Sequence, residues 1–316
     1  MGITSIPVGI WSDPTSNKDL LKPGIRMIWD NTDVNAIVDH PKMFKVTKVD
    51  QYEVSDFRMA GLGDMAETGD GQPARMEAPV VGTRKDFAQK KWTNGFRVTD
   101  MMQKYNKIQL VPRLTRNLKK TMAEGLDKEV FKVYNSASAT TYASGFDTLA
   151  LASASHTCLH DTDVTWSNYL NADLTTAGYE SALKYFYSGI YNDRGQILPR
   201  RAKTLAVNPS LVVKAAQITG ADKKPFEMSN TPYKPDQYFG FSVAPFGTIR
   251  LTSSTAWFLI GDTSDEEFAG PTVFKGMEPD LKTEDAYDTS GDIRVFSAQH
   301  FNYGFGLGYD VYVGDL

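Results

Sequence analysis

The sequence predicts an α+β fold whose strands pair over long sequence distances. Three observations indicate this class. Two β-prone stretches, at 42–58 and 79–99, flank a glycine-rich connection, and apolar residues at helical spacing cover 113–134. The last hundred residues then divide into short β-prone segments separated by Gly, Pro and Asp.

Composition limits the classes of protein that the chain can belong to. With 316 residues, of which 41% are hydrophobic and 23% charged, it can bury a substantial core and divide into two or three structural units. The mean hydropathy is −0.35, and no apolar stretch approaches the roughly 20 residues of a membrane helix. The N-terminus also lacks the pattern of a secretory signal. Cys158 is the only cysteine, which excludes an intrachain disulfide and suits a reducing cytoplasm.

Charge is distributed unevenly along the chain. The net charge is −4, yet residues 82–132 contain 13 Lys and Arg against 5 Asp and Glu, a local balance of +8 that leaves −12 elsewhere. This segment is either a solvated basic face or a surface complementary to the acidic part of another copy, an arrangement that suits head-to-tail rings. The acidic total and the lack of interleaved aromatic residues argue against a dedicated DNA reader.

The N-terminal region is expected to be an extended arm over residues 1–41, because Pro7, Pro14 and Pro23 should interrupt any long element. The stretch at 42–58 follows it. Its apolar alternation slips phase near Val49, which predicts a β-bulge.

The glycine-rich connection predicts a projecting loop. It carries Gly61, Gly63, Gly69, Gly71 and Pro73 and shows no apolar period. A structureless connection of about 20 residues is uncommon inside a compact domain. Strands of about 15 residues on either side would extend roughly 50 Å, whereas a compact chain of this length has a radius of gyration of about 20 Å.

We therefore expect residues 42–99 to form an extended β-hairpin loop that a neighbouring subunit covers, because two-stranded ribbons are marginal alone in water. A loose surface insertion is the alternative. Within the second stretch, Gly95 predicts a bend between alternating residues.

Three helices are predicted. The first covers 113–134 after Pro112, with an apolar stripe that drifts around the helix because its members recur every four residues. The stripe consists of Leu114, Leu118, Met122, Leu126, Val130 and Tyr134. The second covers 176–190. The third follows a short strand at 204–207, with Asn208 as its N-cap, Pro209 in its first turn and Gly220 as its terminator.

A search for catalytic chemistry finds only weak candidates. The sequence contains no phosphate-binding loop, no nucleophile elbow and no C-x-x-C pair. His156, Cys158 and His160 would align on one face of a strand, as zinc ligands can, although a structural role is the favoured interpretation.

Two further clusters receive similar interpretations. The acids Asp265, Glu266 and Glu267, and those from Glu278 to Asp292, could gather a hard cation, but solvated loops are favoured. The GFGLG stretch at 304–308 lacks the following helix of a dinucleotide site, so it predicts close backbone packing. We expect no catalytic, cofactor-binding or metal-binding residues and no enzymatic activity.

The order of the predicted elements resembles that of a known family. An N-terminal arm, a glycine-rich hairpin loop, a long helix, a strand and helix joined by Asn-Pro, and terminal strands are the layout of the Hong Kong 97-type major capsid protein of tailed bacteriophages. WTNGFRVTDMM at 92–102, ALASASHT at 150–157 and LAVNPSLVVKAAQI at 205–218 resemble the branch related to the major head subunit of Mu-like phages. The resemblance covers roughly residues 40–316.

The resemblance implies a division of the chain. It implies a spine helix at 113–134, a peripheral domain and an axial domain. The implied segments are an N-terminal arm at 1–41, an extended hairpin loop at 42–99, the spine helix and peripheral domain at 100–220, an axial domain at 221–293, and terminal strands at 294–316 that return to the peripheral domain.

The resemblance also implies a function. The chain would self-assemble as a homo-oligomer of hexamers and pentamers into an icosahedral shell around phage double-stranded DNA, as a virion capsid protein assembled in the host cytoplasm. Expected partners are a portal and a separate scaffolding protein, because the fold begins soon after Met1; a decoration protein is left open, DNA contact would be nonspecific, and no membrane is involved.

Specific residues follow from the same resemblance. The expected intersubunit contacts are Glu67, Arg75, Glu77, Arg84 and Lys85. Crosslinking is not expected, because no motif singles out one lysine of the loop. Two alternatives stay open: an encapsulin-like nanocompartment shell, and a metal-dependent enzyme that uses His156, Cys158 and His160.

Overall fold

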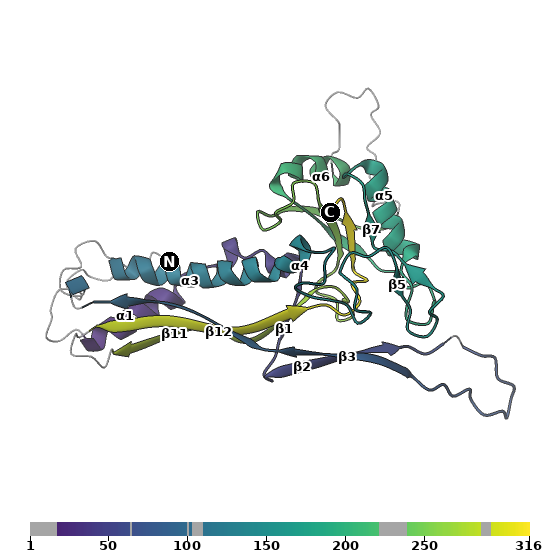
Figure 1. The fold of residues 1–316 in the computed structure, drawn as a ribbon, viewed down its shortest axis with the longest axis horizontal. Helices are drawn as coiled ribbons and strands as arrows, with labels where there is room; N and C mark the ends of the chain where they lie inside the picture. The colour runs from purple at the N-terminus through teal and green to yellow at the C-terminus, as the bar shows by residue number, and fades with distance from the viewer. Residues whose placement is uncertain (1–17, 64, 100, 103–109, 221–238, 286–291) are drawn as a thin grey trace, which may run out of the picture.

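The computed structural model describes residues 18–63, 65–99, 101–102, 110–220, 239–285 and 292–316. Figure 1 shows three parts: a long lower unit in which a helix lies along a sheet, an upper unit at one end of it, and a two-stranded hairpin that projects beyond both. None of the helices in the described ranges is both long and apolar enough to cross a lipid bilayer.

The lower unit is built on a four-stranded sheet with the order β1-β11-β12-β4. β1 pairs in parallel with β11, and β11–β12 and β12–β4 are antiparallel. The strands are β1 (Lys45–Lys48), β4 (Lys90–Val98), β11 (Thr272–Asp285) and β12 (Ile293–Gly304). Thus the predicted second β-stretch contributes to this sheet through pairing that is 195 residues apart at Val98 and Ile293.

The predicted long helix is confirmed as α3 (Leu110–Val130) followed by α4 (Lys132–Asn135). It lies along one face of the lower sheet (Figure 1). Five of the six residues of the predicted stripe are buried, and Leu114 is half-buried. The stripe drifts as expected: its first part packs in the lower unit, and its last part, from Leu126 to Tyr134, reaches the contact between the two units.

The prediction that prolines break every long element before residue 41 is wrong at Pro23. This residue lies inside α1 (Lys18–Asp30). Ile25 and Trp29 on the same helix are buried against α3 and the sheet, and this burial offsets the backbone hydrogen bond that proline cannot donate. Pro7 and Pro14 lie outside the described residues. Two 3₁₀ turns, η2 (Asn35–Ile37) and η3 (His40–Lys42), then lead into β1.

The upper unit is built on a five-stranded sheet with the order β7-β13-β10-β8-β9. β10 has both faces buried: Phe258 and Ile260 pack toward the lower unit, and Trp257 and Leu259 pack toward the helices. The strands are β7 (Tyr169–Leu170), β8 (Ala202–Val207), β9 (Ala244–Gly247), β10 (Trp257–Gly261) and β13 (Val311–Gly314); the helices are α5 (Thr176–Lys184), α6 (Val212–Thr219) and the π-helical turn η4 (Tyr185–Gly189); and β5 (His156–Thr157) pairs with β6 (Thr165–Trp166).

The second and third predicted helices are confirmed. α5 and η4 together cover 176–189. The Asn208 side chain accepts a hydrogen bond from the Ser210 backbone N–H at 3.1 Å and caps the 3₁₀ turn η5 (Pro209–Leu211), and α6 follows directly and ends before Gly220. The strand before this junction, predicted at 204–207, is β8.

The predicted segment boundaries at 100, 220 and 293 do not follow the two sheets. β4 precedes residue 100 and β11 precedes residue 293, yet both belong to the lower sheet. β8 precedes residue 220 and pairs with β10 in the upper sheet. Both sheets are assembled from strands far apart in the sequence, so consecutive ranges cannot separate them. Residues 221–238 and 286–291 lie outside the described part of the chain.

The predicted hairpin is shorter than the range 42–99. Its strands are β2 (Glu53–Ala60) and β3 (Val80–Ala88), which pair antiparallel, while β1 and β4 leave it for the lower sheet. The expected bulge near Val49 is wrong, because the chain changes sheets there. The expected bend at Gly95 is also wrong: the pairing of β4 with β12 is regular, and a Cβ at this position would lie 2.7 Å from the Val295 carbonyl oxygen.

Asp127 of α3 joins the two units. Its carboxylate is fully buried and accepts hydrogen bonds from the backbone N–H of Asp39 at 2.8 Å and from the His40 ring Nδ1 at 2.6 Å. Arg250 of the upper unit approaches it to 3.8 Å, and Thr248 donates to Asp39 at 2.6 Å. One carboxylate therefore holds the long helix, the turn before β1 and the upper unit in a fixed relation.

We predict that this junction weakens in mild acid. Burial outweighs the hydrogen bond with Asp127 and, with Lys275 nearby, lowers the pKa of His40 below its ordinary value of 6.5. When the pKa of a histidine is lower in the folded than in the unfolded state, the unfolded state binds the proton first as the pH falls. The free energy of unfolding therefore decreases as the pH drops below the pKa of the unfolded state. The free energy of unfolding, measured by urea titration from pH 8 to pH 5, should therefore decrease more steeply in the wild type than in His40→Gln.

His160→Gln is the control for this measurement, since His160 is exposed. Its pH dependence should match that of the wild type. A wild-type profile parallel to that of His40→Gln would contradict the assignment.

We predict opposite effects for two glycine substitutions. A Cβ at Gly304 would lie 2.2 Å from the Phe87 ring, so Gly304→Ala should destabilise the fold by about 1–3 kcal/mol. Gly125 lies inside α3, where an added Cβ would meet no heavy atom of the described residues within 4 Å beyond the helix's own backbone, so Gly125→Ala should stabilise the fold by about 0.5–1 kcal/mol. Thermal unfolding of both variants checks the pair, and equal shifts would contradict the close packing of Gly304 against Phe87.

Candidate assembly surface

The hairpin formed by β2, β3 and the connection at 61–79 projects away from both units (Figure 1). We call it the projecting hairpin. Its two faces differ: Arg58 and Ala60 are buried against the chain's own upper unit, whereas Phe57 and Met59, which alternate with them, are 56% and 57% exposed. Met59 pairs across the strands with Val81, which is 64% exposed.

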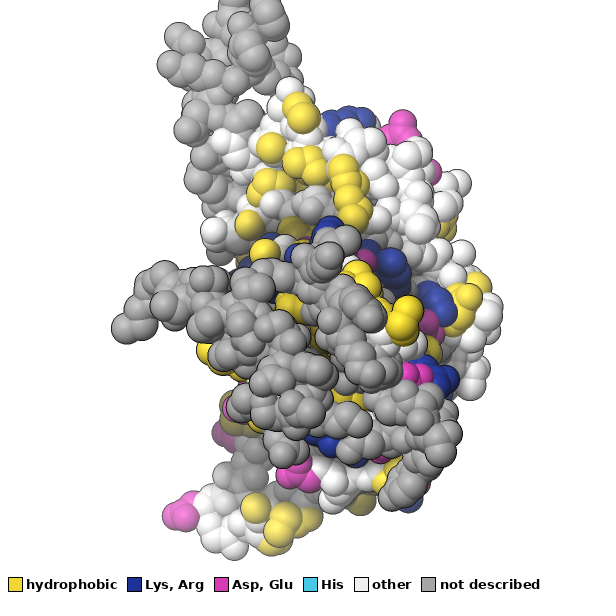
Figure 2. All heavy atoms as spheres, turned by 90° about the vertical axis from the view of Figure 1, so that its left-hand side faces the viewer, with side chains coloured by type: hydrophobic (Ala, Val, Ile, Leu, Met, Phe, Trp, Pro, Cys, Tyr) yellow, Lys and Arg dark blue, Asp and Glu magenta, His cyan; other side chains and the backbone are white. Residues whose placement is uncertain are grey.

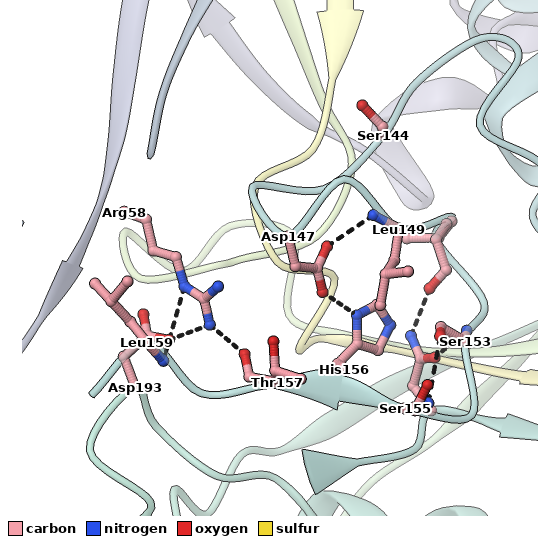
Figure 3. A network of polar contacts seen from close by, with 12 residues as sticks. Arg58, Ser144, Asp147, Leu149, Ser153, Ser155, His156, Thr157, Leu159 and Asp193 are labelled. Carbon is pink, nitrogen blue, oxygen red and sulfur yellow. Dashed lines mark hydrogen bonds and ion pairs between the residues drawn. The ribbon is translucent and has the colours of Figure 1, made fainter. Parts of the chain in front are cut away.

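A buried ion pair anchors the base of the projecting hairpin. The Arg58 guanidinium is 5% exposed, donates from Nε to Asp193 Oδ1 at 2.8 Å, and also bonds the Thr157 carbonyl (Figure 3). Asp193 also accepts from the Leu159 backbone N–H at 3.1 Å. Burial alone would lower the pKa of Arg58, but the hydrogen bond and charge of Asp193 raise it. The cation therefore stays charged, and both partners are satisfied.

A second contact anchors the two ends of the connection. Glu77 accepts from the Gly63 backbone N–H at 2.8 Å and pairs with Arg194 at 3.1 Å, and Arg194 also donates to the Gly61 carbonyl. The Gly63 hydrogen bond, followed by the charges of Arg194 and Arg75, lowers the pKa of Glu77. Only the part of the connection between these points extends free of the body.

A third contact lies at the middle of β3. The Lys85 ammonium reaches Ser144 of the body, where it bonds the backbone carbonyl and donates to the hydroxyl at 2.9 Å. Burial lowers the pKa of this ammonium. On the opposite, outer face, Arg84 donates to Asp86 at 2.7 Å and to Ser55 at 2.8 Å and stays mostly exposed.

The five predicted contact residues therefore take different positions. Glu77 and Lys85 face their own subunit. Arg84 lies on the outer face, Arg75 is mostly exposed and pairs with Glu77 at 2.6 Å, and Glu67 is exposed on the free part of the connection. Glu67, Arg75 and Arg84 remain candidates for contact with another subunit.

Sequence reasoning missed the apolar side chains of the projecting hairpin. Met65 and Met76 of the connection are 101% and 91% exposed. The exposed large apolar residues of the projecting hairpin are Phe57, Met59, Leu62, Met65, Met76 and Val81, and Tyr52 lies just before it. Apolar surface gathered on a thin projection marks an interaction site. The signal in the sequence was a pair of methionines, Met65 and Met76, in a connection without any apolar period.

A second apolar surface lies on the upper unit. α6 and the edge strand β9 enclose a groove of about 540 Å³, lined by Val212, Val213, Ala216, Val243 and Pro245. Figure 2 shows hydrophobic side chains gathered on the upper part of the molecule, at the level of α6. This surface lies apart from the projecting hairpin, at another end of the subunit (Figure 1).

The candidate zinc ligands are not brought together. His156 is buried and bonds Asp147 through Nδ1 at 2.6 Å (Figure 3). Its ring also stacks on that of Trp166, with 4.2 Å between the ring centroids. Cys158 is buried as well, and burial raises the pKa of its thiol, while His160 is exposed. Within the described residues, no group of three or more His, Cys, Asp and Glu could hold a metal ion. The metal-dependent enzyme therefore loses its proposed site.

The Asp147 carboxylate shows why His156 is structural. Burial would raise the pKa of Asp147, but the hydrogen bond and charge of His156, the Leu149 N–H and Arg58 together lower it. The pair of Asp147 and His156 thus supports β5, the short strand whose Thr157 carbonyl Arg58 bonds.

The remaining acidic candidates form no cation site in the described ranges. Asp265, Glu266 and Glu267 lie in an exposed turn, where Asp265 accepts from the Glu267 N–H at 3.1 Å. Of the acids from Glu278 to Asp292, Glu278 pairs with Lys48 at 3.0 Å, and 286–291 lie outside the described residues.

Comparison with known proteins gives one family. The profile of a family described as phage capsid protein matches residues 82–312. A search of curated proteins finds no match.

Solved structures share the fold at low sequence identity. The capsid of Ralstonia phage GP4 has a TM-score of 0.54 and 12% identity, and the match covers 90% of this chain and 88% of that one. The capsid of the native GTA particle has a TM-score of 0.53 and 11% identity, and the match covers 90% of this chain and 92% of that one. A virus-like particle from Pyrococcus furiosus has a TM-score of 0.53 and 10% identity, and the match covers 92% of this chain and 97% of that one. At these identities the likeness shows the fold alone.

We predict that Arg58 is required for the position of the projecting hairpin. Arg58→Met leaves the Asp193 carboxylate buried without its cation and should cost about 3–5 kcal/mol in the free energy of unfolding. Arg84→Met is the matched control on the exposed face and should cost less than about 1 kcal/mol. Urea unfolding measures both values, and limited proteolysis should cut residues 61–79 faster in Arg58→Met only. Equal costs for both substitutions would contradict the anchoring role.

Proposed function

Since the chain belongs to the phage capsid protein family, it is a structural subunit of a virion shell, and we propose that the projecting hairpin of one subunit binds the body of the next to build that shell. The observation that carries this proposal is the exposed apolar surface of a hairpin whose base is fixed by the buried Arg58–Asp193 pair. The family supports a structural role, and we infer that the chain catalyses no reaction.

The parts of the fold suit the Hong Kong 97-type layout. We assign α3 as the spine helix, the lower unit as the peripheral domain, the upper unit as the axial domain and the projecting hairpin as the extended loop. This assignment follows the two sheets, so it replaces the boundaries by residue number. We also propose kinship with the Mu-like head subunit, which rests on the strings at 92–102, 150–157 and 205–218.

The proposed contact is strong enough to matter only when repeated. Burying a side chain such as Phe57 or Met59 contributes about 1.5–3 kcal/mol before the cost of association. The projecting hairpin and the body surface that it would cover are different surfaces, so the contact is heterologous, and such a contact forms rings when the rotation between neighbours closes. Hexamers and pentamers of this kind would form an icosahedral shell, with Glu67, Arg75 and Arg84 adding charge specificity at the rim.

Further partners follow from this role. We propose that assembly occurs in the host cytoplasm around a separate scaffolding protein, that a portal occupies one vertex, and that the finished shell encloses double-stranded DNA. A nanocompartment shell is the rival within the fold, and the match to the phage capsid family favours the virion. A terminase or portal gene beside this one would support the same choice.

We predict that replacing the apolar pair Met59 and Val81 on the outer face of the hairpin by charged residues weakens assembly. Met59→Lys combined with Val81→Glu places opposite charges in a cross-strand pair, which keeps the hairpin paired while removing its apolar surface. The concentration at which rings or shells appear should rise by about tenfold or more, since two apolar contacts are lost. Analytical ultracentrifugation and negative-stain electron microscopy measure assembly, with the presumed scaffold present and absent.

Met27→Lys is the control for this variant, because Met27 is 53% exposed but lies on α1. The control should assemble at the wild-type concentration, and all three proteins should unfold at similar temperatures. Normal shells from the Met59 and Val81 double variant would refute the proposed contact. A wild-type chain that remains monomeric under all of these conditions would refute the role in assembly itself.

A further inference from the structure

The N-terminal half of α3 exposes a row of cations. Arg113, Arg116 and Lys120 follow one another at spacings of three and four residues, so they lie on one side of the helix. All three are exposed. The row spans about 10 Å at 1.5 Å per residue, and it lies on the side of α3 opposite the buried residues Val111, Leu118 and Met122. We call it the α3 basic row.

The α3 basic row is unpaired among the described residues of its own subunit. Across these ranges, none of its three side chains forms an ion pair or a hydrogen bond. Other cations of the same helix do: Lys119 donates to the Trp29 carbonyl at 2.7 Å, and Lys128 pairs with Glu124 at 3.7 Å. The row is therefore separate from the charge network that stabilises the described part of the helix.

The position of the α3 basic row works against helix stability. The N-terminal end of a helix carries partial positive charge, so acidic residues are favourable in the first turn and cations are unfavourable. The first turn of α3 contains no acidic residue, and Arg113 and Arg116 lie in the first two turns. A row of cations kept where the helix disfavours them, and unpaired within the described ranges, points to an external anion.

The chemistry of the row selects the kind of anion. Asn117 and Thr121, which lie beside the row on the same helix, are also exposed and polar. A protein partner would need apolar residues at the centre of its contact, and the row has none. Arg, Lys, Asn and Thr are the side chains that contact phosphate oxygens. Double-stranded DNA presents one negative charge per roughly 1.7 Å of its axis, enough to meet the whole row.

We propose that the α3 basic row lies on the inner side of the shell and neutralises phosphate groups of packaged double-stranded DNA without reading its sequence. The proposal rests on the function proposed above and adds which face of the subunit is turned inward. No aromatic residue lies in α3, so the row offers no ring on which a base could stack, and phosphate contact does not require one. Repetition over all subunits would give the inner surface a regular positive charge in an otherwise acidic protein.

The test uses the unassembled full-length chain and a 30-base-pair duplex of random sequence. Binding is followed by fluorescence anisotropy at increasing salt, for the wild type and for the triple variant Arg113→Gln, Arg116→Gln, Lys120→Gln. Loss of three phosphate contacts should reduce the slope of log affinity against log salt by about 2.7. The control triple variant Arg26→Gln, Lys48→Gln, Lys203→Gln removes the same charge from ion-paired surface positions and should keep the wild-type slope.

Assembled shells decide where the row lies. The α3 triple variant should form shells as the wild type does, seen by electron microscopy, and intact wild-type shells should bind added duplex much more weakly than the unassembled chain. Equal salt slopes for the two triple variants, or duplex binding to intact shells through the row, would overturn the proposal.

Loss of shells in the α3 triple variant, with normal shells in the control, would also overturn it, because the row would then contact an acidic surface of another copy. Failure of the wild type to form any shell would count against the proposed function instead. The duplex measurement on the unassembled chain still decides the phosphate contact in that case.

Discussion

The buried pair of Arg58 and Asp193 is the interaction on which the projecting hairpin depends. A two-stranded hairpin has no core of its own and would sample many directions if only its ends were fixed. Placing a guanidinium between a carboxylate and the Thr157 carbonyl costs desolvation energy, and it repays that cost only in one geometry. An apolar contact in place of the ion pair could hold the hairpin as tightly, but it would tolerate more orientations. The pair therefore sets where the apolar outer face is presented.

The same logic applies between the two units. The apolar core is divided into three clusters, and only one of them, within the described ranges, contains residues of both sheets, such as Val273 and Val313. Such a contact is apolar and permits sliding, whereas the Asp127 carboxylate is satisfied only when the turn at His40 and the upper unit are both in place. A shell subunit must repeat one shape many times, and directional buried polar contacts fix that shape better than apolar area alone.

Sequence reasoning found the elements whose signals are local. The stripe from Leu114 to Tyr134 and the Asn208-Pro209 junction depend on neighbours a few residues away, and both helices were placed within a few residues. It failed where pairing is nonlocal. The stretch at 79–99 has the pattern of one strand, but it divides at Gln89. Its second half pairs with β12, about 200 residues later in the sequence. The prediction that Pro23 interrupts any helix was wrong for a related reason. The burial of Ile25 and Trp29 against α3 outweighs the local preference of proline.

The contact residues were harder to predict from the sequence than the strands, because the charge of a residue does not indicate which way its side chain points. Lys85 and Arg84 are adjacent in the sequence, yet strand alternation turns one toward Ser144 of the same subunit and the other outward. Glu77, another predicted contact residue, accepts from the Gly63 N–H and closes the base of its own loop. Exposed apolar residues, such as Met65 and Met76, are more informative, because apolar surface in water does not stabilise a monomer and marks an interaction site. A subunit that fixes its hairpin with buried charges and leaves the outer face apolar has the properties that assembly requires: a rigid direction, and an apolar surface whose burial awaits another copy.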